Sequence, residues 1–247
     1  MAPGPHGGNR RGGHMVELIV YGDPHRLLLA RVAAEYLAKP DQDNRKRPLQ
    51  LLRRGHFSIF RHVHVTCQFR TSLIVRDHLF RYTTAAMAAA GLRINEAEGI
   101  VPPVLDSPPA KQAVEATEWM TLGAYHRLRD AGIRMQDARY AAPCGVEVSY
   151  IMTFNFLTLM QAVFPQRLWE PGAQAETRQT VQDLWEVVWA QDPELWEAAR
   201  EKLGPEAIRW EKARWQLRKK NPDLYQSILK ETPMQSVWDS AGESPQS

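Results

Sequence analysis

The segment from His62 to Arg70, HVHVTCQFR, alternates polar and apolar side chains and constrains the fold more than any other feature of this chain. Alternation with a period of two is typical of a β-strand that has one buried and one exposed face. Two further segments, VELIVYG from Val16 and VEVSYIMT from Val146, predict strands that can pair with it. Because these strands lie among helical patterns, we expect an α+β fold with a central, mainly antiparallel sheet flanked by helices.

Most of the remaining chain has the spacing of amphipathic helices. We expect helices at residues 26–38, 72–83, 110–128, 136–141, 155–164 and 173–229, which makes the C-terminal region helical. The last of these ranges is divided at Pro193, at Gly204-Pro205 and at Asn221-Pro222, because proline ends or restarts a helix. Polar and proline-rich stretches predict loops at 41–48 and 101–109.

The composition is that of an ordinary globular protein, since 44% of the 247 residues are hydrophobic and 24% are charged. We expect a single domain at residues 16–235, between a disordered lead-in at 1–15 and a disordered tail at 236–247. The net charge of +3 slightly favours ligands that carry phosphate, and it is too small to predict nucleic-acid binding.

No apolar stretch is long enough to span a bilayer, and residues 1–15 lack the apolar core of a secretory signal, so we expect a cytoplasmic protein without membrane contacts. The two cysteines, Cys67 and Cys144, form neither a disulfide framework nor a metal-binding pattern, and we expect both in the core. The glycine-rich phosphate-binding motifs are also absent, so a nucleotide would need another kind of surface.

Two separated segments, residues 55–95 and 137–178, carry most of the candidate chemistry. The first contains His56, Ser58, Phe60 and His62, then Arg81-Tyr82-Thr83, and then Ala86, Ala89, Gly91 and Arg93-Ile94. The second contains Ala138-Arg139 before Pro143, then Thr153 and Asn155, and finally Ala173-Gln174, Glu176 and Arg178 in the pattern A-Q-x-E-x-R. In order and spacing these residues resemble the flavin-dependent thymidylate synthase family.

The resemblance implies methylation of a uracil nucleotide at C5, with FAD, NADPH and 5,10-methylenetetrahydrofolate as participants. It also implies a homotetramer whose flavin sites are shared between subunits. Carried over to this chain, the substrate-binding residues are His78, Arg81, Gly91, Arg93, Arg139, Arg167 and Arg178, and Arg93 and Arg167 are the catalytic groups that stabilise negative charge on the uracil carbonyl. The cofactor-binding residues are His62, Arg81, Tyr82, Thr83, Ala89, Asn155 and Gln161, and no metal is implied.

The chain departs from the family at its most diagnostic motif. Where the family has R-H-R followed by serine, glutamate, serine and tyrosine, this chain has R-Y-T followed by Ala86, Ala89, Gly91 and Ile94. Other replacements are Arg61 for an acidic residue, His78 for glutamine, Leu157 for arginine and Gln161 for histidine. The family spacing of the arginine that orients the pyrimidine falls on Gln166, and we assign the role to Arg167, one residue later.

Replacing hydroxyl and carboxylate groups by alanine and glycine opens volume, which would admit the 2′-hydroxyl of UMP. We therefore favour UMP over dUMP, a variant of the reaction that belongs to nucleoside-antibiotic biosynthesis. Two alternatives stay open: a dUMP-specific enzyme with a divergent site, and a non-catalytic relative that binds a nucleotide.

Some of these residues also have a purely structural interpretation. Residues 83–90, TTAAMAAA, are typical of a helix end that packs closely against a neighbour, and Asn155 is typical of a helix N-cap. The tryptophans from Trp169 onward could stack on nucleobases, but we expect them in the core or at subunit contacts.

Overall fold

The computed structural model describes residues 15–38, 44–89, 96–97, 99–101 and 103–231, and its four strands form one antiparallel sheet. The strands are β1 (Met15–Tyr21), β2 (His64–Ser72), β3 (Ala86–Ala89) and β4 (Glu147–Asn155), in the spatial order β1-β2-β4-β3. The predicted fold class is confirmed. The predicted disordered ends lie outside the described residues, apart from Met15 in β1, and they stay predictions.

The centre of the sheet is the pair β2 and β4. His64 lies opposite Asn155 at one end, which we call the Asn155 end, and Ser72 lies opposite Glu147 at the other, the Glu147 end. Alternate residues of both strands are buried, as the alternation in the sequence predicts. This register fixes which site residues can meet, because it places each strand terminus at a known end of the sheet.

The described helices include all of those that the sequence predicts, with somewhat different boundaries. They are α1 (Leu27–Tyr36), α2 (Arg47–Arg53), η1 (Ser58–Arg61), α3 (Leu73–Phe80), α4 (Pro108–Asp130), α5 (Met135–Ala138), η2 (Arg139–Ala141), α6 (Phe156–Thr158), the π-helical η3 (Leu159–Val163) and η4 (Pro165–Trp169), α7 (Ala175–Trp189), α8 (Pro193–Leu203), α9 (Pro205–Lys220) and α10 (Pro222–Glu231). No helix of this described part is long and apolar enough to cross a membrane.

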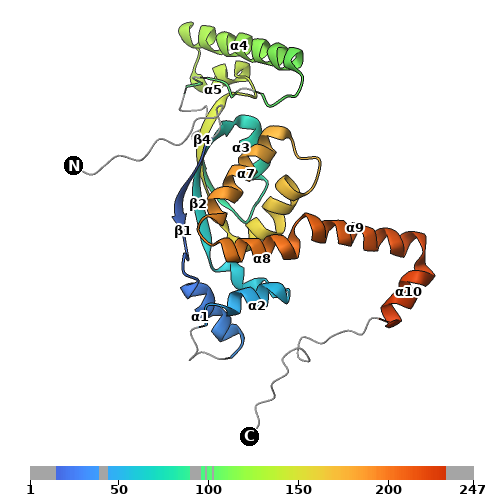
Figure 1. The fold of residues 1–247 in the computed structure, drawn as a ribbon. Helices are drawn as coiled ribbons and strands as arrows, with labels where there is room; N and C mark the ends of the chain where they lie inside the picture. The colour runs from blue at the N-terminus through green and yellow to red at the C-terminus, as the bar shows by residue number, and fades with distance from the viewer. Residues whose placement is uncertain (1–14, 39–43, 90–95, 98, 102, 232–247) are drawn as a thin grey trace.

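Helices α3 and α7 lie against one face of the sheet, and the core fills the space between them (Figure 1). An aromatic cluster closes the core, with neighbouring ring centroids 5.1 to 6.2 Å apart, and consists of Phe156, Phe164, Trp169, Trp185 and Trp196. The core interpretation is therefore confirmed for these three tryptophans. Trp189, Trp210 and Trp215 are exposed and lie outside the core, and for them the alternative of subunit contacts stays a prediction.

Four local predictions are corrected. The helix that begins after Asn155 does not end before Pro165 but continues through η4, because the backbone takes π-helical bonding on both sides of the proline. Residues 86–89 are an edge strand, not a helix end, because pairing with β4 satisfies their backbone groups. Helix α2 begins at Arg47, inside the predicted loop 41–48. Cys144 is exposed, because the turn before β4 runs along the surface.

The last two helices leave the body of the molecule. Helices α9 and α10, residues 205–231, extend away from the sheet and bury none of their side chains (Figure 1). We call them the C-terminal arm. An arm with this much exposed surface does not stabilise the core, so its side chains are available for contacts with other molecules.

Candidate functional site

Side chains from the end of α3, from η4 and from the start of α7 form one cluster, which we call the Arg167 cluster: His78, Tyr82, Gln166, Arg167 and Thr177. Nε of Arg167 donates a hydrogen bond to the hydroxyl of Tyr82 across 3.1 Å, and this hydroxyl donates to Oε1 of Gln166 across 3.3 Å. Nδ1 of His78 lies 2.7 Å from Oγ1 of Thr177. The fold thus brings together three predicted site residues, His78, Tyr82 and Arg167.

The titratable side chains of this cluster differ in charge at neutral pH. Burial lowers the pKa of His78, and the positive charge of Arg167 lowers it further. Burial also raises the pKa of Tyr82, an effect that the hydrogen bond from Arg167 opposes. At neutral pH an uncharged imidazole and an uncharged phenol therefore lie beside one guanidinium, which is an arrangement suited to an anionic or carbonyl-bearing ligand.

The guanidinium of Arg167 is fixed by a hydrogen bond on its Nε side, and its terminal nitrogens can bind a ligand. Its bond to Tyr82 uses Nε, and no described residue accepts a hydrogen bond from its two terminal nitrogens. Its Cζ lies 5.9 Å from the centroid of the Tyr82 ring, which limits the directions that the guanidinium can take. The terminal nitrogens form a planar fork that fits a phosphate or a carbonyl oxygen. Arg167 is thus oriented and still able to bind.

The A-Q-x-E-x-R stretch at the start of α7 holds this site together. Oε1 of Gln174 accepts hydrogen bonds from the backbone N–H of Thr177 at 2.8 Å and from its hydroxyl at 2.9 Å, so it caps the helix. The buried carboxylate of Glu176 accepts from the backbone N–H of Ser72 at 3.0 Å and from its hydroxyl at 2.8 Å. This connects α7 to the start of α3, the helix that carries His78.

Arg178, which the resemblance assigns to the substrate, has a structural partner. Its Nη1 donates to the carbonyl oxygen of Leu168 at 3.2 Å and its Nη2 to that of Glu170 at 2.8 Å. These carbonyls lie at the end of η4. Arg178 therefore fixes the segment that carries Arg167, and any contact with substrate would use its remaining donors.

A second group of candidates lies at the Asn155 end of the sheet. Oδ1 of Asn155 accepts from the backbone N–H of Thr158 at 2.8 Å and from its hydroxyl at 2.9 Å, which confirms the N-cap interpretation. The same hydroxyl lies 2.7 Å from Oγ1 of Thr84, next to Thr83. His62 and Gln161 are exposed, His62 just before β2 and Gln161 just after this cap.

Other predicted site residues do not join these groups within one chain. Arg139 is exposed and precedes the Glu147 end of β4, and the rise of this nine-residue strand puts Glu147 on the order of 25 Å from Asn155. Arg81 is exposed at the end of α3, and Ala89 is exposed on β3. Gly91 and Arg93 lie outside the described residues.

Sequence reasoning missed the hydroxyl groups that support the site. Thr177 contacts His78, and Thr84 with Thr158 connects the loop after α3 to the cap at Asn155. Gln166, which we passed over in favour of Arg167, contacts Tyr82 together with it. The signal available in the sequence is position, since each of these residues is adjacent to a motif residue or within three residues of one.

Comparisons with known proteins identify the family and the fold. The family model described as thymidylate synthase complementing protein matches residues 17–194, and the chain therefore belongs to the flavin-dependent thymidylate synthase family, as a divergent member. It is thereby placed among the thymidylate synthase-like pyrimidine nucleotide methyltransferases.

A solved structure similar to this chain is that of the UMP/dUMP methylase PolB from Streptomyces cacaoi bound with 5-Br dUMP. The TM-score is 0.64 at 20% sequence identity, and the match covers 79% of this chain and 97% of that chain. At this identity the likeness shows the fold. No curated protein matches the chain.

The residues at the Asn155 end and around Arg81 fit the flavin that the family uses. A flavin dinucleotide needs a cation for its pyrophosphate and amide or hydroxyl groups for its ring edges. The exposed side chains of Arg81, Thr83 and Gln161 offer this chemistry. Among the described residues, no group of three or more His, Cys, Asp or Glu side chains is placed to hold a metal ion.

Proposed function

We propose that this protein methylates a uridine monophosphate at C5, and that UMP is its preferred substrate. The observation that carries the proposal is the orientation of the Arg167 guanidinium. Tyr82 fixes this orientation, and no described residue accepts a hydrogen bond from the two terminal nitrogens. The family match covers this region, which supports pyrimidine nucleotide methylation as the reaction.

Arg167 acts as the electrostatic group of this reaction. The enolate form of uracil, in which C5 is nucleophilic, carries negative charge on a ring carbonyl oxygen, and a guanidinium fixed in advance stabilises this charge without reorganisation. His78 is uncharged and offers a hydrogen bond to the pyrimidine edge. Arg81 and Arg178 add positive charge for the phosphate, and Arg93 and Gly91 complete the substrate contacts that the family resemblance implies.

The cofactors that we propose are FAD, 5,10-methylenetetrahydrofolate and NADPH. His62, Arg81, Tyr82, Thr83, Ala89, Asn155 and Gln161 hold the flavin. When bound in its reduced form, the flavin supplies the electrons that turn the transferred methylene into a methyl group. The protein contributes orientation of the substrate and stabilisation of charge.

The preference for UMP is supported by the small residues of β3. Ala86 and Ala89 are exposed and replace larger polar residues of the family, so their strand adds no side-chain oxygen to the site. A pocket with this spare volume would accept the ribose 2′-hydroxyl that a pocket fitted to dUMP rejects. We also assign the product to nucleoside-antibiotic biosynthesis.

We propose a homotetramer in which neighbouring subunits complete each site. The support is the position of Arg139, which precedes the Glu147 end of β4 while Asn155 is at the other end. In one chain Arg139 and the flavin candidates at the Asn155 end therefore lie apart, and a second chain would bring them together. We further propose that residues 16–235 form the folded domain of each subunit.

A direct assay tests the function. The purified protein is incubated with FAD, NADPH and 5,10-methylenetetrahydrofolate, and with UMP or dUMP, and the nucleotides are analysed by mass spectrometry. We expect 5-methyl-UMP at a higher kcat/KM than thymidylate. A faster reaction with dUMP would identify a dUMP-specific enzyme. A protein that binds the nucleotide but no flavin, and forms neither product, would be the non-catalytic relative.

A further inference from the structure

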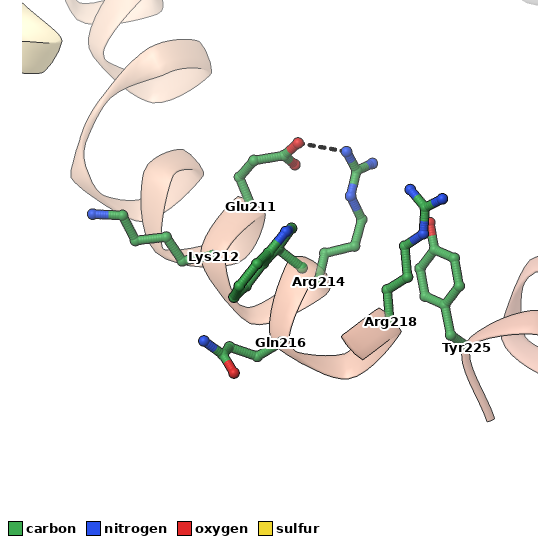
Figure 2. Close-up of a pocket in the computed structure, with 7 residues that line it drawn as sticks. Glu211, Lys212, Arg214, Gln216, Arg218 and Tyr225 are labelled. Atoms are coloured by element: carbon green, nitrogen blue, oxygen red, sulfur yellow. Dashed lines mark hydrogen bonds and ion pairs between the residues drawn. The ribbon is translucent and has the colours of Figure 1, made fainter. Parts of the chain in front are cut away.

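The C-terminal arm carries a pocket that the family fold does not explain. The family match ends at residue 194, before the arm begins, and the PolB-like part of the chain accounts for almost all of that structure. The pocket has a volume of about 510 Å³, within the usual range for small-molecule sites. Its lining residues come from both arm helices and are Glu211, Lys212, Arg214, Trp215, Gln216, Arg218 and Tyr225 (Figure 2).

The pocket is lined by more cationic than anionic side chains. Helix α9 has six lysine and arginine residues and two glutamates, and three of these cations line the pocket. Nζ of Lys212 is 3.5 Å from a carboxylate oxygen of Glu170, and Arg214 forms an ion pair with Glu211. Arg218 has no carboxylate partner among the described residues. Figure 2 shows it on the same side of the pocket as Tyr225. It is thus the cation most able to bind an added anion.

The pocket also presents aromatic surface. Trp215 is 56% exposed, although an indole of this size is normally well buried, and Tyr225 faces the same pocket from α10. Nζ of Lys219 lies 5.1 Å from the centroid of the Trp215 ring, which adds positive charge beside the indole. An exposed aromatic ring next to an unpaired arginine is the combination that binds a planar base attached to a phosphate.

We propose that this pocket binds a nucleoside phosphate, with the base stacked on Trp215 and the phosphate paired with Arg218. The site is separate from the Arg167 cluster, since the two have no residue in common. It is nevertheless connected to that cluster, because Lys212 pairs with Glu170, whose backbone carbonyl accepts a hydrogen bond from Arg178. A nucleotide on the arm is thereby held close to the segment that positions Arg167.

The ligand could be a free nucleotide or one unit of a single strand, and two probes distinguish these sources. Equilibrium dialysis with UMP counts the sites per chain, and fluorescence anisotropy with a labelled oligouridylate of about twelve nucleotides measures strand binding. The test variant is Trp215→Ala/Arg218→Ala. The control variant is Trp210→Ala/Arg209→Ala, which removes the same two side-chain types from α9 at positions that do not line the pocket.

If the ligand is a free nucleotide, the test variant binds one UMP per chain fewer than the wild type and the control. If it is part of a strand, oligouridylate binds the wild type and the control at least tenfold more tightly than the test variant. The proposal is overturned if the test variant equals the control with both probes. It is also overturned if inorganic phosphate displaces both probes as well as UMP does, because the base then contributes nothing.

Failure of the proposed methylation would not affect this comparison. If the Arg167 cluster binds no UMP, the number of sites decreases equally in all three proteins, and the difference between test and control remains.

Discussion

Arg167 donates a hydrogen bond from Nε to the hydroxyl of Tyr82 across 3.1 Å, and this bond joins η4 to the turn that follows α3. Tyr82 stands where the family has the histidine of its R-H-R motif. The replacement therefore has a role of its own in this chain, because the tyrosine supports an arginine that is one position away from the family spacing. We propose that the altered motif and the shifted arginine are two parts of one arrangement.

Removing the hydroxyl of Tyr82 tests this arrangement. Tyr82→Phe removes the group that contacts both Arg167 and Gln166 and keeps the ring. We expect kcat/KM for the nucleotide to fall about tenfold and the free energy of unfolding to fall by about 1 kcal/mol. Steady-state kinetics and urea denaturation measure the two effects.

The matched control is Tyr36→Phe, whose hydroxyl lies 3.1 Å from Nδ1 of His56 in an exposed position. It should change both quantities much less. Equal kinetic effects of the two variants would contradict the role of Tyr82.

The buried carboxylate of Glu176 should be important for stability. Glu176→Gln replaces an acceptor of two hydrogen bonds from Ser72 by a neutral amide that cannot accept both. We expect a loss of about 1 to 3 kcal/mol in the free energy of unfolding. Glu186→Gln is the control, because Glu186 is exposed and its carboxylate bonds only to Gln182 on the same helix among the described residues. A loss below about 0.5 kcal/mol in the Glu176 variant would be too small for a buried acceptor.

His78 should make stability depend on pH. Its pKa in the folded state is lowered by burial and by Arg167 and Arg81, against the opposing effect of Asp77 and Glu176. A lowered pKa means that the folded state favours the neutral form. The contribution is therefore complete above the unfolded pKa of about 6.5 and is lost as the pH falls toward the lower folded value.

Urea denaturation at several pH values between about 7.5 and 5 measures this effect. The decrease in unfolding free energy should be smaller in His78→Gln than in the wild type. Identical slopes in the two proteins would show that His78 does not titrate as the structure implies.

The two cysteines should differ in reactivity. Cys67 is buried in β2, and burial raises the pKa of its thiol to about 12, whereas Cys144 is exposed. Because the thiolate is the reactive form, a thiol reagent should modify one cysteine per folded chain at once and the second only after unfolding. Rapid modification of both in the native protein would contradict the burial of Cys67. Cys144→Ser should abolish the fast phase.

The sequence could predict the elements whose pattern is local. The strand at β2 follows from the alternation around Cys67, and the N-cap at Asn155 follows from residue type. The alanines of β3 could not be assigned, because they become a strand only by pairing with β4, which is a tertiary contact. The exposure of Cys144 depends in the same way on the path of a turn.

The sequence predicted the site only in part, because it determines the positions of motif residues but not their tertiary contacts. The family resemblance selected His78, Tyr82 and Arg167, which the fold brings together, and their roles stay predictions. It did not predict that Arg178 binds the carbonyls of η4, since the partner of an arginine depends on which backbone lies near it. The pocket at Trp215 was also missed, because a tryptophan on an amphipathic helix is more often buried.

The most direct test of the account is release of tritium from UMP labelled at C5, measured with the wild type, Arg167→Ala and the exposed control Arg200→Ala. Methylation replaces the hydrogen at C5, so the label enters water only if the reaction occurs. We predict release by the wild type and the control, and a rate about a hundredfold lower for Arg167→Ala, the usual effect of losing a group that stabilises developing charge. Release at the wild-type rate by Arg167→Ala, or no release by the wild type supplied with all cofactors, would contradict it.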